Sequence, residues 1–246
     1  MFGTSGSGKS LVSYLLAKEL SKHEKTLLLN VDIQNPCIDI YTCEKEKNKN
    51  ILDILEQLEL CKDKEYVKEY ISKKSNVDCI YSNLSLYESQ SKLNISKYEH
   101  LLNYANKNYI YSIFDLTNCI FIDQIKYFLI NSSDIIFVVN PNYISIRQAI
   151  KYLEIINQLW KIPSSKIKIV LNKVSNRSLN KTLIKSLLPD YDIYGIIQYS
   201  SKVEEAINMG NDLCINADFR KLLNSFGISL KKEISFLKSM VNTVDK

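Results

Sequence analysis

An eight-residue segment near the N-terminus constrains the fold more than any other feature of the chain. Gly3-Thr-Ser-Gly-Ser-Gly-Lys-Ser10 has the spacing G-x-x-x-x-G-K-[ST], and an amphipathic stretch follows it directly. Small residues let the backbone wrap closely around an anion, so that successive N–H groups point at its oxygens. A helix that begins near Lys9 adds the positive end of its dipole. The segment therefore predicts a phosphate-binding loop before a helix; the alternative is a flexible Gly/Ser tail.

The residue types of this loop predict distinct chemical roles for its last two positions. Lys9 is expected to reach the β- and γ-phosphates of a nucleotide, and the Ser10 hydroxyl to ligate Mg²⁺. The whole loop and the residue after it are expected to bind the nucleotide. These residues are Gly3, Thr4, Ser5, Gly6, Ser7, Gly8, Lys9, Ser10 and Leu11.

Short apolar runs alternate with longer amphipathic ones along the chain, which is typical of βαβ units. The expected strands are Thr26–Val31, Val77–Tyr81, Ile110–Phe114, Ile135–Val139, Ile167–Leu171 and Ile193–Ile197. Apolar stripes at helical spacing predict helices from Leu11 to Leu20 and from Ile146 to Leu159, and Asp63–Ser75 is expected to be a charged helix. We therefore expect an α/β fold with three layers, in which helices flank a mostly parallel central sheet.

The strand that should lead into the phosphate loop has almost no sequence, because only Met1 and Phe2 precede Gly3. A missing central strand would leave backbone groups of its neighbours unpaired, at about 1–3 kcal/mol each. We therefore expect the first strand to be missing and the natural chain to begin upstream of Met1. Residues 1–226 are expected to form one ATPase domain, and residues 227–246 an amphipathic helix or tail.

Two acidic residues follow expected strands. Asp32 follows Leu27–Val31, and Asp115 follows Ile110–Phe114. Ligands of open α/β sheets gather at the carboxyl ends of strands, so both carboxylates are expected to face the phosphates. We predict that Asp115 holds Mg²⁺ together with Ser10, and that Asp32 contributes to the metal site and orients the attacking water. Lys9, Asp32 and Asp115 are thus the expected catalytic residues; a helix cap or turn is the alternative for each Asp.

The expected strand Ile167–Leu171 ends in Asn172-Lys-Val-Ser175. Guanine-specific proteins with this loop carry an Asp in place of Ser175, and a serine cannot supply the same charged acceptor. The segment therefore favours ATP over GTP, with the Asn172 amide as a base contact. An ordinary strand-ending asparagine is the alternative.

Composition excludes several other classes of protein. The net charge of +5 over 246 residues is weak evidence for nucleic-acid binding, so DNA is not an expected partner. Six scattered cysteines without a Cys-x-x-Cys pair are expected to be free thiols, and two isolated histidines do not predict a metal site. The sequence has no signal peptide and no apolar run that could span a bilayer. We expect a cytoplasmic protein.

In combination, these motifs resemble the MinD/ParA group of P-loop ATPases, and within it the CpaE-like proteins of pilus assembly. The resemblance covers nearly the whole chain. After the phosphate loop it runs through Leu27–Pro36, Tyr109–Leu116, Ser133–Asn142 with Ser145–Ala149, Asn172-Lys173, and Gly195–Tyr199 with Val203–Ala206. It implies a nucleotide-dependent homodimer with ATP at the interface and slow ATP hydrolysis that controls binding to a protein partner of an assembly machine. It also gives Lys9, Ser10, Asp32, Asp115 and Asn172 the roles described above.

The chain departs from this group at two positions. The group often has a second loop Lys that reaches the partner's nucleotide, where this chain has Thr4, and a further Asp where it has Asn30. These differences favour nucleotide binding over fast hydrolysis, and a non-hydrolysing scaffold is the alternative function. A bacterial P-loop tyrosine kinase is a weaker alternative, because none of the 16 tyrosines follows Tyr199.

The C-terminal segment carries apolar residues at helical spacing from Leu230 to Val244, interspersed with lysines. Short tails of this kind attach MinD-like proteins to membranes through apolar burial and attraction to anionic lipid. The membrane surface is therefore an expected partner, and location at the inner face of the plasma membrane follows. A helix packed on the domain or on a second copy is the alternative.

Overall fold

The computed structural model describes residues 1–44, 50–60, 65–82, 95–211 and 213. Eight strands in this part of the chain form two hydrogen-bonded groups, with the orders β3-β4-β2-β5 and β1-β6-β7-β8. All neighbouring strands are parallel except β3 and β4. The strands are β1 (Phe2–Gly3), β2 (Thr26–Asn30), β3 (Ser72–Lys74), β4 (Val77–Ile80), β5 (Tyr111–Asp115), β6 (Ile135–Val139), β7 (Ile167–Val174) and β8 (Asp192–Gln198).

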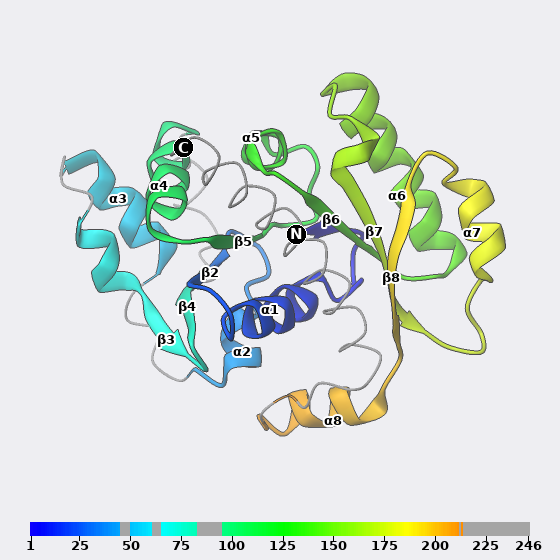
Figure 1. Cartoon of the computed structure of the whole chain (residues 1–246), viewed down its shortest axis with the longest axis horizontal. Helices are drawn as coiled ribbons and strands as arrows, with labels where there is room; N and C mark the ends of the chain where they lie inside the picture. The colour runs from blue at the N-terminus through cyan, green and yellow to red at the C-terminus, as the bar shows by residue number, and fades with distance from the viewer. Residues whose placement is uncertain (45–49, 61–64, 83–94, 212, 214–246) are drawn as a thin grey trace, which may run out of the picture.

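Met1 connects the two groups of strands. Its terminal nitrogen donates to the Phe114 carbonyl of β5 (2.7 Å), and its own carbonyl accepts from the Leu116 N–H (3.2 Å). On its other side, β1 pairs with β6, with Phe2 opposite Phe137 and Gly3 opposite Val138. The strands therefore follow one another across the molecule as one twisted layer, with the N-terminus at its centre (Figure 1).

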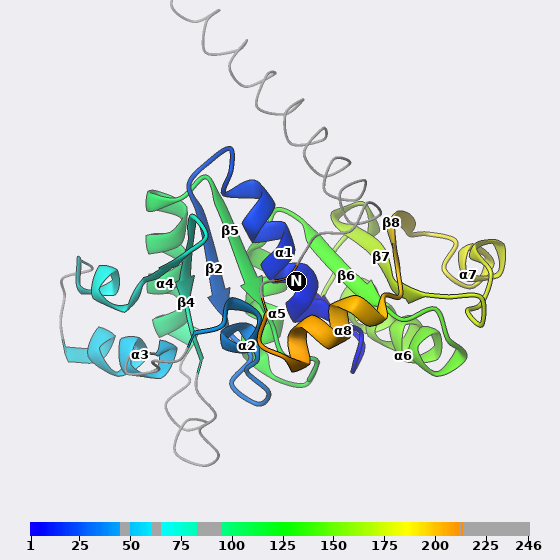
Figure 2. The same cartoon turned by 90° about the horizontal axis from the view of Figure 1, so that it is seen from below.

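Helices cover both faces of this layer. On one face lie α1 (Lys9–Leu20), α2 (Ile38–Thr42) and α8 (Ser201–Asn208), which cross in front of the strands in Figure 2. The other face carries α4 (Ile95–Asn108) and α5 (Asp123–Asn131), with α3 (Ile51–Leu60) packed on α4 and α6 (Tyr143–Glu154) on β6. The remaining elements are α7 (Lys181–Leu187), which packs on α6, and the short helices η1 (Glu65–Tyr70), η2 (Ile155–Leu159) and η3 (Ser164–Lys166).

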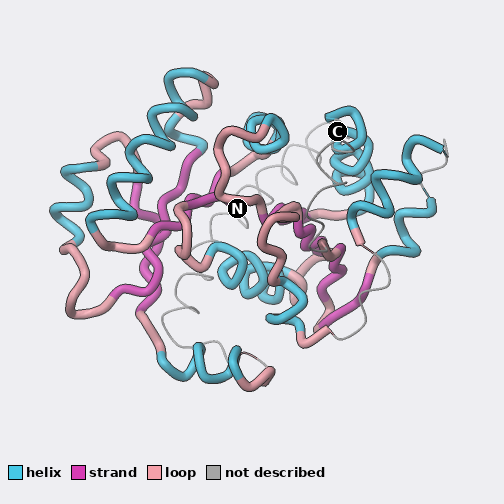
Figure 3. The backbone as a smooth tube through the Cα atoms, turned by 180° about the vertical axis from the view of Figure 1, so that it is seen from behind, coloured by secondary structure: helices cyan, strands magenta, loops and turns pink. Residues whose placement is uncertain are grey.

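Alternating side chains of the strands fill two apolar cores. Leu27 and Leu29 point into the core beneath α3, α4, α5 and α6, whereas Leu28 joins the core beneath α1. Strands buried on both faces need continuous apolar sequence, and β2 reads TLLLN with all five residues buried. This is why the apolar runs predicted the strands well, and the three layers are visible from behind in Figure 3.

The α/β prediction is confirmed, with two corrections to the expected elements. The charged segment Asp63–Ser75 is not one helix, because its described part forms η1 and the edge strand β3. A tight turn at Ser75 and Asn76, both with positive φ, connects β3 to the antiparallel strand β4. The first strand is not wholly absent: Phe2 and Gly3 form a two-residue β1 in the central position.

No helix in the described ranges is long and apolar enough to cross a bilayer. The expected tail, 227–246, and most of the polar loop Glu44–Asn50 lie outside the described residues.

Candidate functional site

The phosphate loop connects β1 to α1 at the carboxyl end of the sheet. Gly6 and Gly8 both have positive φ values, 65° and 80°, which only glycine adopts without strain. Gly3 is required for a different reason, because a Cβ there would lie 2.2 Å from the Val138 carbonyl oxygen. No side chain caps the start of α1 at Gly8. The first N–H groups of a twelve-residue helix are thus available to an anion.

Lys9 lies at the centre of a buried charged cluster. Its Nζ is 2.9 Å from Asp32 Oδ2 and 3.9 Å from Asp115 Oδ1, and it donates to Ser10 Oγ at 3.4 Å. Burial lowers the pKa of Lys9, but the charges of Asp115 and Asp32 outweigh burial and raise its pKa overall. Lys9 therefore stays a cation, and the two carboxylates hold it in the absence of phosphate.

Asp115 is fully buried at the end of β5 and is only partly satisfied. Its Oδ1 accepts a hydrogen bond from Ser13 Oγ (3.1 Å), whereas its Oδ2 has no hydrogen-bond partner. Burial raises the pKa of Asp115, so the carboxylate needs positive charge nearby to remain ionised. Hard cations such as Mg²⁺ prefer oxygen ligands, and this orphaned oxygen together with the neighbouring Ser10 hydroxyl fits one.

Asp32 is held in a turn directly after β2. Its Oδ1 accepts from the backbone N–H groups of Gln34 (3.2 Å) and Asn35 (2.9 Å), while its Oδ2 faces Lys9. Asn30 accepts from the Asp32 N–H through its Oδ1 (3.0 Å). Asn30, which stands where the related group often has an Asp, thus helps to form the Asp32 turn. An Asp at this position could accept the same hydrogen bond, but it would add negative charge to the site.

Asn172 lies behind the phosphate loop and is buried. Its Nδ2 donates to the Ser7 carbonyl (2.7 Å), and a Cβ on Gly8 would lie 2.5 Å from this nitrogen. The amide therefore supports the loop from behind, which the sequence did not predict. The predicted base contact stays a prediction for this residue.

An apolar cavity of about 110 Å³ opens beside Gly8 and Asn172. Its walls come from α1, α2, the end of β8 and the length of α8. They include Leu11, Tyr41, Ile197, Tyr199, Val203 and Ile207. A flat, mostly apolar ring fits such walls, and the cavity adjoins the phosphate loop. The cavity is thus a candidate base site, and among its lining residues the sequence analysis named Gly8, Leu11 and Asn172 as nucleotide contacts.

Thr4 is buried and engaged inside its own chain. Its Oγ1 lies 2.5 Å from the Ser145 Oγ of α6, and the neighbouring Ser5 N–H donates to Gln148 Oε1. The side chain at this position therefore anchors the loop to α6.

Two site residues escaped prediction from the sequence. Ser13 lies one helical turn after Lys9, a spacing that would have placed it beside the same carboxylates. Cys37 lies against the Ser10 hydroxyl, and burial raises the pKa of its thiol. No pattern in the sequence linked Cys37 to the loop, because the turn that places it there has no regular spacing.

Comparison with solved structures shows where this fold occurs. A ParA family ATPase from Chlorobium tepidum TLS superposes with a TM-score of 0.80 at 19% identity, over 92% of this chain and 98% of that one. MinD of Pyrococcus horikoshii OT3, complexed with Mg-ADP, gives 0.74 at 14% identity, over 96% and 97%. The MinC:MinD complex of Aquifex aeolicus also gives 0.74, at 17% identity, over 94% and 95%.

Sequence comparison supplies the family. No curated protein matches the sequence. The model of the CobQ/CobB/MinD/ParA nucleotide-binding domain matches residues 2–213, which is most of the chain and includes every site residue described above. The chain therefore belongs to the CobQ/CobB/MinD/ParA family of nucleotide-binding domains.

Proposed function

We propose that this protein binds ATP with Mg²⁺ and hydrolyses it slowly, and that the bound nucleotide controls its association with a second copy and with a protein partner. The observation that carries the proposal is the cluster of Lys9, Asp32 and Asp115 at the uncapped start of α1, in which both carboxylates lie within ion-pair distance of the ammonium. The adjoining apolar cavity supports a nucleotide rather than a free phosphate as the ligand.

Lys9 has two sets of partners in this proposal. Without nucleotide it pairs with Asp32, and with nucleotide it turns to the β- and γ-phosphates, which releases the Asp32 carboxylate. Asp32 is then free to accept a hydrogen bond from the attacking water. Asp115 and Ser10 would hold Mg²⁺, and the metal would supply positive charge to the phosphate oxygens.

Exposed apolar side chains support the proposed association between copies. Tyr143 and Ile144 begin α6 with exposed fractions of 69% and 82%, and Ser145, the next residue, contacts Thr4 of the phosphate loop. Large apolar side chains on this rim lie where a second copy would cover the nucleotide.

A non-hydrolysing scaffold is the second candidate function, and the burial of Thr4 favours it. A side chain that is 1% exposed and bonded to Ser145 cannot reach the nucleotide of a second copy. Hydrolysis therefore depends on groups of the same chain or on a partner protein.

The test is Mg²⁺-dependent ATP turnover by the purified full chain and by Lys9→Ala. Turnover that is lost in Lys9→Ala but retained in Lys185→Ala, a lysine in an exposed ion pair with Asp192, supports the ATPase. Equal background rates in all three proteins, with ATP binding intact, support the scaffold.

Two finer parts of the proposal come from the sequence alone. The motif resemblance suggests a role in pilus assembly, which deletion of the gene and a count of pili would test. The apolar spacing from Leu230 to Val244 suggests membrane attachment. Equal co-sedimentation of the full chain and of a chain that ends at Phe226 with anionic vesicles would contradict attachment.

A further inference from the structure

Three hydrogen bonds connect the phosphate loop to the segment that follows β5. The Ser5 N–H donates to Gln148 Oε1 (3.3 Å). Gln148 Nε2 donates in turn to the Tyr152 hydroxyl (2.9 Å), and this hydroxyl donates to the Asn118 carbonyl (3.0 Å). Gln148 and Tyr152 are four residues apart in α6, so their side chains lie on the same face of the helix. We refer to this pair of side chains as the α6 relay.

Every link of this chain runs in the same direction, from donor to acceptor. The Ser5 N–H is a donor only, so Gln148 must present its oxygen to Ser5 and its NH₂ group to Tyr152. Tyr152 has one hydroxyl proton and gives it to Asn118, which leaves its oxygen to accept from Gln148. Hydrogen bonds in such a chain polarise one another, so loss of the first link weakens the links that follow.

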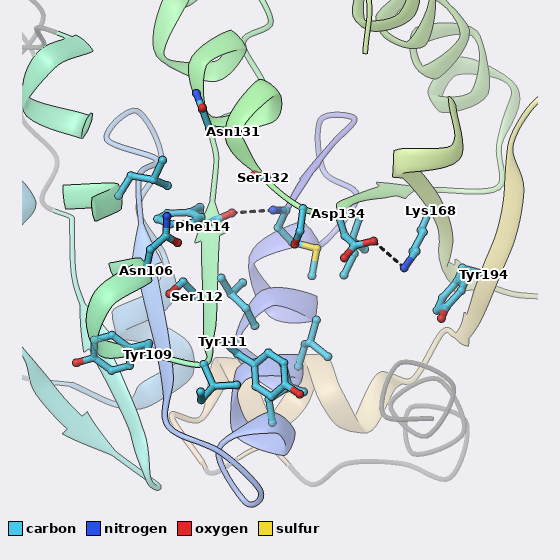
Figure 4. A pocket seen from close by; sticks show the side chains of 18 residues that line it. Asn106, Tyr109, Tyr111, Ser112, Phe114, Asn131, Ser132, Asp134, Lys168 and Tyr194 are labelled. Atoms are coloured by element: carbon cyan, nitrogen blue, oxygen red, sulfur yellow. Dashed lines mark hydrogen bonds and ion pairs between the residues drawn. The ribbon is translucent and has the colours of Figure 1, made fainter. Parts of the chain in front are cut away.

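The last member of the relay and the start of the segment after β5 are both held by other contacts. The Tyr152 ring stacks on Phe2 of β1, with the ring centroids 5.7 Å apart and the planes at 29°. The Phe114 carbonyl accepts from the Met1 nitrogen, as the dashed line in Figure 4 shows, and the Leu116 N–H donates to the Met1 carbonyl. None of these contacts involves a side chain of the phosphate loop, so they persist when a ligand enters the loop.

Residues 117–122, which follow this fixed start, are held unevenly. Thr117 Oγ1 donates to Gln34 Oε1 (3.0 Å), and the Ile120 side chain is buried in the core. The Asn118 carbonyl, which the relay holds, lies between these two points of attachment. Phe121 has the largest side chain of the segment, yet 86% of it is exposed. The relay therefore acts on the part of the segment that the core holds least.

We propose that the α6 relay couples nucleotide at the phosphate loop to the position of residues 118–121. This inference rests on the proposed function, because a phosphate oxygen has to take the Ser5 N–H away from Gln148. Gln148 then loses the donor that fixes its orientation, and the hydrogen bond from Tyr152 to Asn118 weakens. The segment is held in the nucleotide-free chain and loosens when nucleotide binds, which frees the exposed Phe121 to move.

Tyr152→Phe tests the last link, because it removes only the hydroxyl and keeps the ring stacked on Phe2. In the nucleotide-free full chain, we expect amide exchange over residues 118–121 to become about tenfold faster. On dilute monomer with Mg²⁺ and a non-hydrolysable ATP analogue, we expect exchange there to rise in the parent and to stay constant in the variant. Tyr191→Phe is the matched control and should behave as the parent, since it removes a hydroxyl that donates to a different carbonyl, that of Leu153 (3.5 Å).

Gln148→Leu tests the chain as a whole, because it cuts the first two links without touching the Asn118 carbonyl. We expect it to lose the nucleotide response of residues 118–121, as Tyr152→Phe does. It should also bind the analogue about threefold more tightly, because no side chain then competes with phosphate for the Ser5 N–H. Isothermal titration measures this affinity.

The same nucleotide response in both variants as in the parent would overturn the relay. Slower exchange over residues 118–121 in the parent with nucleotide would overturn it as well, because the segment would then tighten rather than loosen. Absence of analogue binding in the titration would overturn the proposed function itself. Binding without any change at residues 118–121 would overturn the relay alone, so the two proposals fail in distinguishable ways.

Discussion

Lys9 illustrates how single residues set the state of the site. Two carboxylates hold its ammonium, one at 2.9 Å and one at 3.9 Å, and neither can follow it to a phosphate because both are fixed at the ends of their strands. Under the proposed function, nucleotide binding would therefore exchange the contact of Lys9 with Asp32 for contacts with phosphate oxygens. In this proposal, Asp32 and the nucleotide phosphates compete for the Lys9 ammonium. Binding of the phosphates would free the Asp32 carboxylate for the attacking water.

Asp32→Ala separates binding from turnover. We expect affinity for ATP to be retained or increased, because Lys9 loses a competing partner, and turnover to fall about 100-fold, because the water loses its hydrogen-bond acceptor. Isothermal titration with a non-hydrolysable analogue and a phosphate-release assay measure the two effects. Asp192→Asn, which removes a carboxylate that is 93% exposed, is the control. Turnover within about twofold of the parent in Asp32→Ala would remove Asp32 from the mechanism.

Residues of the candidate site were predictable to different degrees. The phosphate loop has fixed spacing, and Asp32 and Asp115 follow apolar runs, so their positions at one end of the sheet could be derived from the sequence. Asn172 was placed at the site, but its support of the loop through Ser7 depends on a contact over 165 residues of chain. Tyr199 and Ile207 line the base cavity from distant elements, and no spacing relates them to the loop.

Among the elements, the two-residue strand β1 holds the central position between the two groups of strands. Its two residues and Met1 provide the contacts between the strand groups, and Gly3 carries the chain into the phosphate loop against Val138. The apolar runs predicted the other central strands because those strands are buried on both faces. The apolar pattern did not predict β3, which lies within the expected helix Asp63–Ser75. β3 is an edge strand whose three residues are partly or fully exposed, so it has no apolar run.

The buried amine of Met1 makes the stability of this element depend on pH. Its pKa is about 5 in the folded chain, whereas an ordinary N-terminal amine has a pKa of 8.0, so the unfolded chain binds the proton first as the pH falls. Stability is then fully present above about pH 8 and is lost as the pH falls toward 5, by at most about 4 kcal/mol. Asp115 and Lys9 are the charged groups that act on this amine.

Urea unfolding between pH 5 and pH 8 measures this effect, and an N-terminally acetylated chain is the control. The acetylated chain keeps an N–H donor for Phe114 but has no amine to titrate, so other titrating groups contribute equally to both. We expect the difference in unfolding free energy between the two chains to grow as the pH falls. A difference that is constant over the range would show that the Met1 amine is charged in the folded chain.

At the scale of the whole molecule, the carboxyl end of the sheet gathers the phosphate loop, both aspartates and the base cavity on one rim. The start of α6 belongs to the same rim, because Ser145 and Gln148 contact the loop directly. Under the proposed function, nucleotide at the loop would therefore act on the first turn of α6 through these contacts. An apolar pair on that turn, Tyr143 and Ile144, is in position to transmit nucleotide state to a second copy.

Ile144→Glu tests whether this rim is the contact between copies. In analytical ultracentrifugation with Mg²⁺ and a non-hydrolysable ATP analogue, we expect the parent chain to dimerise and the variant to dimerise at least about tenfold more weakly, because a charge is buried at the contact. Leu159→Glu is the matched control, since Leu159 is similarly exposed at 72% but lies in η2, at the opposite end of the helical stretch that begins with α6. Affinity for the analogue measured on dilute monomer should be equal in all three chains, because neither side chain lines the nucleotide site. If both variants dimerised as the parent does, copies would associate through another surface, and if Leu159→Glu alone failed to dimerise, that surface would include η2.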